Sequence, residues 1–159
     1  MTIRALQHGD CEILSTFFLA NDRTEITDHF HPFPLTSETA HRLVHNPTRD
    51  LYYIALEHDY ILGFCMLRGW DEGYAIPSFG VLVDYRHLGR RLGKQLTEFA
   101  IAKARSMDCP AVRLSVCENN DRALRLYASL DFREVARETA KEFSTGNAKI
   151  VMLKDLKNV

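Results

Sequence analysis

A basic, glycine-containing segment in the middle of the chain constrains the fold more than any other part of the sequence. Residues 83–96 read VDYRHLGRRLGKQL, so an apolar strand ending at Val83 is followed by a loop around Gly89 and by a helix that begins near Gly93. A short apolar strand is predicted at 111–116, after this helix has ended. Strand, helix and strand in this order predict that the two strands pair in parallel.

The rest of the chain supplies the other elements of a sheet. Its hydrophobic periodicity predicts hairpins, which pair antiparallel, and amphipathic helices, which cover a sheet. We therefore expect an α/β (α+β) fold with a mixed, mostly antiparallel central sheet of about seven strands and helices on both faces. The further strands are predicted at 2–6, 51–57, 61–67, 75–83, 132–138 and 148–153, the helices at 11–20, 36–46, 92–107 and 120–130, and a loop at 21–34.

The composition is that of one ordinary domain with almost no net charge. At about 150 residues per domain, the 159 residues predict a single domain, 1–159, and 46% hydrophobic residues suffice for one core. Lys plus Arg number 20 and Asp plus Glu 21, so the formal net charge is −1. Because a general nucleic-acid binder carries a clear basic excess, this function is excluded, and a local feature must hold any anionic ligand.

The cysteines and the distribution of apolar residues favour a cytoplasmic protein. The four cysteines are scattered and none forms a C-x-x-C pair, which is typical of reduced thiols. No apolar run approaches the roughly 20 residues that a membrane span requires, and no apolar signal region follows the first residues. The pairs His29/His31 and His41/His45 lack an accompanying carboxylate motif, so we expect surface histidines and no metal.

The segment 83–96 is a local feature of the kind that an anionic ligand needs. A helix N-terminus presents unpaired N–H groups and a partial positive charge, and glycines let the backbone approach a phosphate closely. The pattern is neither a Walker loop nor a dinucleotide-binding G-x-G-x-x-G. Five basic side chains add positive potential at this place: Arg86, His87, Arg90, Arg91 and Lys94.

The same segment resembles a motif of the Gcn5-related N-acetyltransferases, the GNAT superfamily. Their pattern V-x-P-x-Y-R-G-x-G-x-G has its first and last glycines where this chain has Gly89 and Gly93. Leu88 replaces the usual Gln or Arg, and Arg91 replaces the middle Gly or Ala. Arg91 therefore either changes the local backbone or adds a contact to a phosphate.

A second block resembles the same family. Residues 120–132 read NDRALRLYASLDF and follow the N-x-x-A-x-x-L-Y-x-x-x-G-F signature, with Asp131 in place of the glycine. Aspartate tolerates a left-handed, helix-ending conformation better than most residues, so we expect the turn to survive. Together the two blocks cover residues 79–133, about a third of the chain.

The resemblance implies that acetyl-CoA is the donor substrate. Residues 75–133 would form the acetyl-CoA-binding core and residues 1–74 would supply the acceptor side. The backbone of Val81 and Val83 would pair with the pantetheine arm, Asn120 would contact this arm, and Tyr127 would face the sulfur. The loop that would hold the pyrophosphate comprises Leu88, Gly89, Arg90, Arg91, Gly93 and Lys94.

Acyl transfer to an amine requires a base, an oxyanion donor and a route for the thiolate to leave. A backbone N–H near Val83 would bind the oxyanion, and Tyr127 would protonate the thiolate, although a core aromatic at helical spacing is the alternative for this residue. Glu72 is the favoured base because it lies in the loop before the strand at 75–83. The other carboxylates considered are Glu57, Asp71 and Glu118.

The acceptor is the least determined part of the prediction. We expect a primary amine of a small molecule, for example an amino sugar, in an aromatic pocket of Phe30, Phe33 and Trp70. Direct transfer in a ternary complex needs no nucleophilic cysteine, so Cys117 is interpreted as a packed thiol. The alternatives are a protein or peptide N-acetyltransferase and a non-catalytic acyl-CoA-binding regulatory module. The oligomeric state, monomer or homodimer, stays open.

Overall fold

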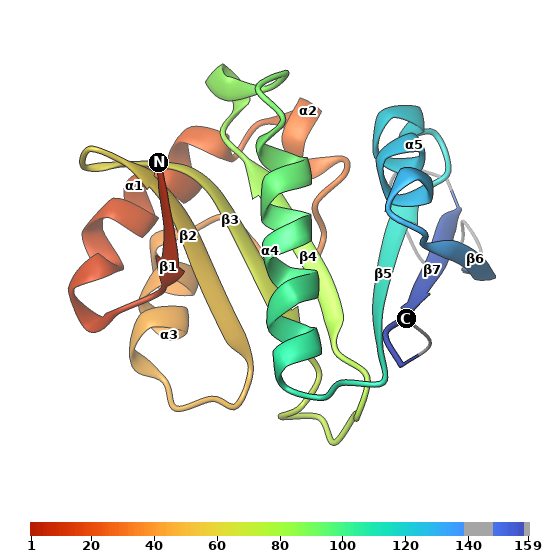
Figure 1. The fold of residues 1–159 in the computed structure, drawn as a ribbon. Coiled ribbons are helices and arrows are strands. Elements are labelled where there is room, and N and C mark those ends of the chain that lie inside the picture. The colour runs from red at the N-terminus through yellow and green to blue at the C-terminus, as the bar shows by residue number, and fades with distance from the viewer. Residues whose placement is uncertain (139–147, 158–159) are drawn as a thin grey trace.

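A computed structural model describes residues 1–138 and 148–157 of the chain. In these residues, seven strands form one sheet in the order β1-β2-β3-β4-β5-β7-β6 (Figure 1). Neighbouring strands are antiparallel except β4 and β5, which are parallel. The mixed, mostly antiparallel sheet predicted from the sequence is therefore confirmed. The strands are β1 (Thr2–Ala5), β2 (Leu51–Glu57), β3 (Tyr60–Arg68), β4 (Ser78–Val83), β5 (Ala111–Cys117), β6 (Arg133–Glu138) and β7 (Lys149–Asp155).

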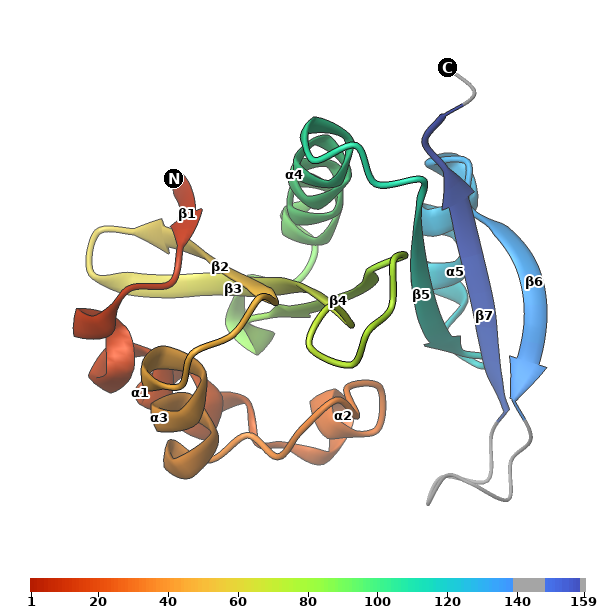
Figure 2. The ribbon, with the colours of Figure 1, turned by 90° about the horizontal axis from the view of Figure 1, so that it is seen from below.

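Helices cover both faces of the sheet, as Figure 2 shows for α1 and α3 on one side and α4 on the other. The α-helices of the described residues are α1 (Cys11–Asn21), α2 (Thr24–Thr27), α3 (Ser37–His45), α4 (Leu92–Ser106) and α5 (Asp121–Ser129). Two short 3-10 turns, η1 (His8–Asp10) and η2 (Tyr85–His87), precede α1 and α4. In the sequence, α2 lies in the segment that was predicted to be a loop.

Alternation along the strands separates the core into two layers. In β3, Phe64 and Met66 join the cluster under α1 and α3, whereas Cys65 and Leu67 join the cluster under α4 and α5. All four side chains are buried. Because α4 and α5 pack on the same layer, the two motif-bearing helices share one face of the sheet.

Strand β4 begins at Ser78, three residues after the predicted start. Residues 69–74 form a turn in which the Tyr74 N–H donates to the Gly69 carbonyl. Pro77 has no N–H for a ladder, and its carbonyl accepts from the Arg113 N–H at 2.9 Å. The loop therefore extends to Pro77, and β4 begins directly beside β5.

The sheet opens between its two parallel strands. Ser78 and Arg113 are the one registered pair that joins β4 and β5 in the described part of the chain. Beyond this pair the strands separate, and Figure 1 shows β4 and β5 diverging toward α5. The edge of β4 beyond Phe79, from Gly80 to Val83, is consequently not paired with β5.

Candidate functional site

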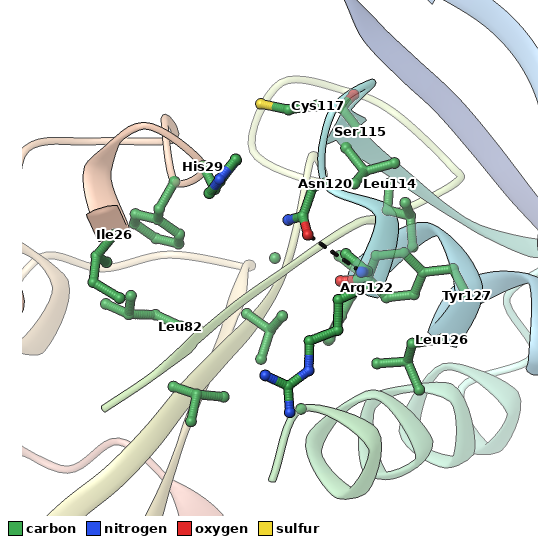
Figure 3. Close-up of a pocket in the computed structure, with 18 of the residues that line it drawn as sticks. Ile26, His29, Leu82, Leu114, Ser115, Cys117, Asn120, Arg122, Leu126 and Tyr127 are labelled. Atoms are coloured by element: carbon green, nitrogen blue, oxygen red, sulfur yellow. Dashed lines mark hydrogen bonds between the residues drawn. The ribbon is translucent and has the colours of Figure 1, made fainter. Parts of the chain in front are cut away.

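A cavity of about 690 Å³ occupies the opening between β4 and β5. Its walls come from α2 and the loop after it, the end of β3, β4, the loop into α4, β5, α5 and the start of β7. Figure 3 shows Ile26, His29 and Leu82 on one side of this space and Asn120, Leu126 and Tyr127 on the other. Both sequence blocks that resemble the acetyltransferase motifs therefore border one cavity.

The backbone of β4 presents unused hydrogen-bonding groups to this cavity. The Asp84 N–H donates to the Leu62 carbonyl at 2.9 Å, and the register pairs Gly63 with Val83. Because paired and unpaired positions alternate in an antiparallel ladder, the N–H and C=O groups of Val81 and Val83 point away from β3. They face the side from which β5 has diverged.

A buried carboxylate anchors the loop that follows β4. Asp84 is 1% exposed and accepts hydrogen bonds from the Arg86 N–H at 2.9 Å and from the Arg86 side chain at 3.0 and 3.1 Å. Asn21, at the end of α1, donates to Asp84 at 3.4 Å and accepts from the Tyr85 N–H at 2.9 Å. Burial alone would raise the pKa of Asp84, but the hydrogen bonds from Arg86 and Asn21 outweigh it and lower this pKa.

The first turn of α4 has the features of an anion-binding site. Gly89 has φ 86° and Arg91 has φ 61°, so the chain turns twice through the left-handed region before the helix begins at Leu92. Arg91 is the N-cap residue, and because a guanidinium has donors only, its side chain cannot cap the N–H groups of the first turn. A Cβ built on Gly93 would lie 3.9 Å from Leu126 and 4.0 Å from Val83, in the gap beside β4. These residues fit a pyrophosphate at the helix N-terminus.

Most of the predicted pyrophosphate residues line the cavity. Arg90 does not: its guanidinium donates toward the His87 Nδ1 at 2.9 Å and lies 3.5 Å from the Glu57 carboxylate. The predicted residues that line the cavity are Leu88, Gly89, Arg91, Gly93 and Lys94, together with Val81 and Val83 of β4.

Asn120 and Tyr127 both reach the cavity from α5. The Asn120 Oδ1 accepts from the Ala123 N–H at 3.3 Å and so caps the helix, as the dashed line in Figure 3 shows. Tyr127 is 7% exposed, and its ring has edge contacts with Phe79 and Phe132 at centroid distances of 6.5 and 5.7 Å. Tyr127 is thus a core aromatic that also lines the cavity. Burial raises its pKa.

The acidic residues considered as bases lie away from the cavity lining. Glu72 is exposed in the turn at 69–74, where its N–H donates to Gly69. Asp71 accepts from Thr48 and from the Arg49 N–H in the same region. Glu57 and Glu118 are likewise absent from the lining, since Glu57 pairs with Arg90 and Glu118 with Arg137.

Other titratable residues line the cavity instead. They lie within residues 1–74, the predicted acceptor side, but none of them was predicted to have a catalytic role. Glu25 of α2 lines the cavity, and its carboxylate lies 2.7 Å from the Arg23 guanidinium. His29 and His31 follow from the loop after α2. Burial, together with the charge of Lys149, lowers the pKa of His31. The H-x-H spacing beside Pro32 was visible in the sequence, but only α2 brings it against β4.

The predicted aromatic pocket does not assemble. Phe30 and Phe33 are buried under α1 and α3, and Arg68 stacks over the Phe33 ring at 5.8 Å. Trp70 packs against the other layer of the core, under α4 and α5, and lies outside the cavity lining. Phe30 and Phe33 lie together, with ring centroids 5.3 Å apart, and Phe30 lines the cavity, but Trp70, in the other layer of the core, does not join them.

The remaining candidates are a thiol and the histidine pairs. Cys117 is buried at the cavity wall and donates to the Asp28 carbonyl at 3.6 Å, and burial raises its pKa. In the described residues, no group of three or more His, Cys, Asp or Glu side chains could hold a metal ion. Within the same residues, no helix is long and apolar enough to cross a membrane.

Comparisons with known proteins agree with the fold and with the motif blocks. The model of the acetyltransferase (GNAT) family matches residues 14–132. No curated protein sequence gives a significant match. One similar solved structure is a GNAT-family acetyltransferase from Streptococcus pneumoniae, with 18% identity, a TM-score of 0.81 and 98% of each chain covered. A ribosomal-protein-alanine N-acetyltransferase from Brucella melitensis has 19% identity and a TM-score of 0.81, with 98% of this chain and 100% of that chain covered. Mutant forms of the spermidine/spermine N-acetyltransferase from Vibrio cholerae have 17% identity and a TM-score of 0.75, with 98% of this chain and 94% of that chain covered. At these identities the similarity establishes the fold alone.

Proposed function

The chain belongs to the GNAT acetyltransferase family, and we propose that it moves an acetyl group from acetyl-CoA to a primary amine of a small molecule. The observation that carries this proposal is the open edge of β4, which leads from the first turn of α4 into the cavity. One end of the cavity would hold the pyrophosphate and the other would receive the acceptor. Both substrates would thus meet in one ternary complex.

The cofactor arm would follow the open edge of β4. The N–H and C=O groups of Val81 and Val83 are directed away from β3, so an extended amide-containing chain can pair with them as an additional strand. Gly89 and Gly93 leave the backbone of the loop and of α4 accessible to the diphosphate. Arg91 and Lys94 supply positive charge beside it.

Acetyl transfer would then proceed by direct attack of the amine on the thioester carbonyl. The new C–N bond forms as the C–S bond breaks, and the amine loses a proton while the thiolate gains one. An N–H of Val81 or Val83 would stabilise the oxyanion, because both face the cavity. CoA supplies the activated acyl group, and the chain's residues supply the positioning and the proton transfers.

The proposed acid is Tyr127 and the proposed base is His31. Burial raises the pKa of Tyr127, which makes it a weaker acid, but burial also raises the pKa of the Cys117 thiol in the same cavity. A CoA thiolate there is likewise a stronger base than in water, so proton transfer from Tyr127 stays feasible. The pKa of His31 is lowered, so its imidazole is neutral at pH 7 and able to accept a proton.

Two measurements test the proposal. Calorimetry should show binding of acetyl-CoA, and release of CoA thiol should be detected with at least one amine from a panel of amino acids, amino sugars, polyamines, aminoglycosides and peptides. Absence of acetyl-CoA binding would contradict the proposed function. Binding without thiol release from any amine would favour the non-catalytic acyl-CoA-binding module, and release with peptides alone would favour a protein acetyltransferase.

A further inference from the structure

Three basic side chains lie on one face of the sheet at the acceptor end of the cavity. We use the term acceptor end for the part of the lining formed by Arg68, Ser78, Arg113, Lys149 and residues 29–32. The register pairs Arg68 with Ser78 and Ser78 with Arg113, so these side chains are cross-strand neighbours on the same face. Lys149 is paired with Cys117, which has the same strand parity as Arg113, and so lies on this face too.

The charges of these side chains are compensated to different degrees. Arg113 lies 3.3 Å from the Glu138 carboxylate and 3.5 Å from the Ser78 hydroxyl. Arg68 stacks on Phe33 and, among residues 1–138 and 148–157, forms no ion pair with a carboxylate. Glu25 is the carboxylate of the lining, and it is already paired with Arg23. Arg68 therefore brings to the acceptor end a positive charge that no carboxylate of the described residues pairs with.

A partly buried guanidinium in a cavity gains more from an anion than an exposed one does. Charge-assisted hydrogen bonds to a carboxylate or phosphate are strong, and the planar guanidinium binds both groups in a bidentate manner. The same positive charge disfavours a polycationic acceptor, since like charges in a shared site repel. The cavity thus distinguishes between classes of amine that the fold alone does not.

We propose that the acceptor is a small amine that also carries an anionic group, a carboxylate or a phosphate, and that Arg68 binds this group. The inference rests on the proposed acetyltransferase function and specifies its substrate class. Ser78, beside Arg68, lies three residues before Val81, or about 10 Å along the strand at ~3.3 Å per residue. An arginine side chain spans part of this distance, so an acceptor of amino-acid size places its amine near the thioester.

The test compares matched pairs of acceptors with acetyl-CoA as donor. Glycine and β-alanine are measured against their amides, phosphoethanolamine against ethanolamine, and spermidine is included as a polycation. The expected wild-type result is a higher kcat/KM for at least one anionic amine than for its neutral partner, by about 10- to 100-fold. The carboxylate and phosphate pairs tell the two anionic groups apart.

The Arg68→Gln variant then identifies the residue responsible. In this variant the ratio of kcat/KM for the anionic amine to kcat/KM for its neutral partner should fall toward one, and the KM for acetyl-CoA should not change. The control is Arg105→Gln, on the exposed side of α4, which should keep the wild-type ratio. A preference for neutral amines or spermidine, turnover of no anionic amine, or an unchanged ratio in Arg68→Gln would overturn the inference. If the wild-type protein does not bind acetyl-CoA at all, the result would instead contradict the proposed function.

Discussion

Tyr127 illustrates how one side chain can belong to both the core and the site. Its ring packs edge-on against Phe79 and Phe132, while the residue also lines the cavity. Tyr127→Phe keeps the ring, so we expect kcat to fall by about 10²-fold or more, the typical contribution of a positioned acid, with little change in the KM for acetyl-CoA. Steady-state kinetics measure this.

The pH profile and a second buried tyrosine complete this prediction. Because burial raises the pKa of Tyr127, the phenol stays protonated and wild-type kcat should not decline as the pH rises through 10, the ordinary tyrosine value. Tyr53→Phe is the matched control, since Tyr53 is buried in the same core layer outside the cavity lining. Equal kcat values for Tyr127→Phe and wild type would remove Tyr127 from the acid role.

His31 gives a prediction with the opposite pH dependence. A base must be neutral, and the lowered pKa of His31 keeps it neutral at pH 7, so kcat/KM should fall only as the pH drops below about 6.5. His31→Gln should lower kcat/KM at pH 7 by about 10²-fold and remove this acidic limb. His41→Gln, on an exposed face of α3, serves as the control. If Glu72→Gln rather than His31→Gln abolishes the limb, the base is Glu72.

At the scale of elements, Asp84 ties the end of α1 to the loop before α4. Asp84→Asn replaces a buried charge that Arg86 and Asn21 both satisfy, so we expect a loss of about 1–3 kcal/mol in the free energy of unfolding at pH 7. Because the pKa of Asp84 is lowered in the fold, its stabilisation is present above the unfolded-state pKa and is lost as the pH falls through the folded value. The difference between wild type and variant should therefore shrink in acid.

Urea unfolding at several pH values measures this difference, with Glu98→Gln on the exposed side of α4 as the control. The same variant should bind acetyl-CoA more weakly, since the loop that presents the α4 N-terminus loses its anchor. A difference in unfolding free energy that stays constant from pH 7 to pH 3 would contradict the proposed role of the carboxylate.

Elements that local chemistry determines were predictable from the sequence. Asp131 ends α5 in the left-handed region, φ 67°, with the Phe132 N–H bonded to the Tyr127 carbonyl, as expected for a residue replacing glycine. Arg91, which also replaces a small residue of the motif, likewise has a left-handed backbone, with φ 61°, in the loop before α4. Glu72, which the sequence suggested as the base, is exposed in the turn at 69–74 and lies outside the cavity lining. Its position depends on the turn of residues 69–77, which tertiary contacts hold: the Asp50 carboxylate accepts from the Gly69 and Trp70 N–H groups, and the Pro77 carbonyl accepts from the Arg113 N–H.

The proposed acceptor side was less predictable because it is assembled from distant parts of the chain. His29 and His31 reach the cavity through α2, a single helical turn without a hydrophobic pattern of its own. Arg68, Ser78 and Arg113 become neighbours only through strand register, which the sequence does not specify residue by residue. The proposed cofactor-binding end, by contrast, lies in two continuous segments with motif spacing.

For the whole molecule, the opening between β4 and β5 is the feature in which the proposed cofactor and acceptor sites meet. A substitution at Gly93 tests whether the cofactor occupies this opening. A methyl group at position 93 would make ordinary contacts with Leu126 and Val83, so the protein alone can accept Gly93→Ala. Because alanine favours a helix over glycine by about 0.5–1 kcal/mol, the ligand-free variant should be as stable as wild type or more so. The methyl group also occupies space that the cofactor is proposed to fill, so binding should weaken.

The two effects have opposite signs, and thermal unfolding separates them. At 100 times its dissociation constant a ligand stabilises the folded state by about 2.7 kcal/mol, so saturating acetyl-CoA should raise the wild-type Tm clearly. Gly93→Ala should keep or raise the ligand-free Tm while the shift caused by acetyl-CoA becomes smaller. Ala102→Gly, at an exposed position of the same helix, controls for helix propensity by lowering the ligand-free Tm without altering the shift. An undiminished shift in Gly93→Ala would place the cofactor elsewhere than beside β4.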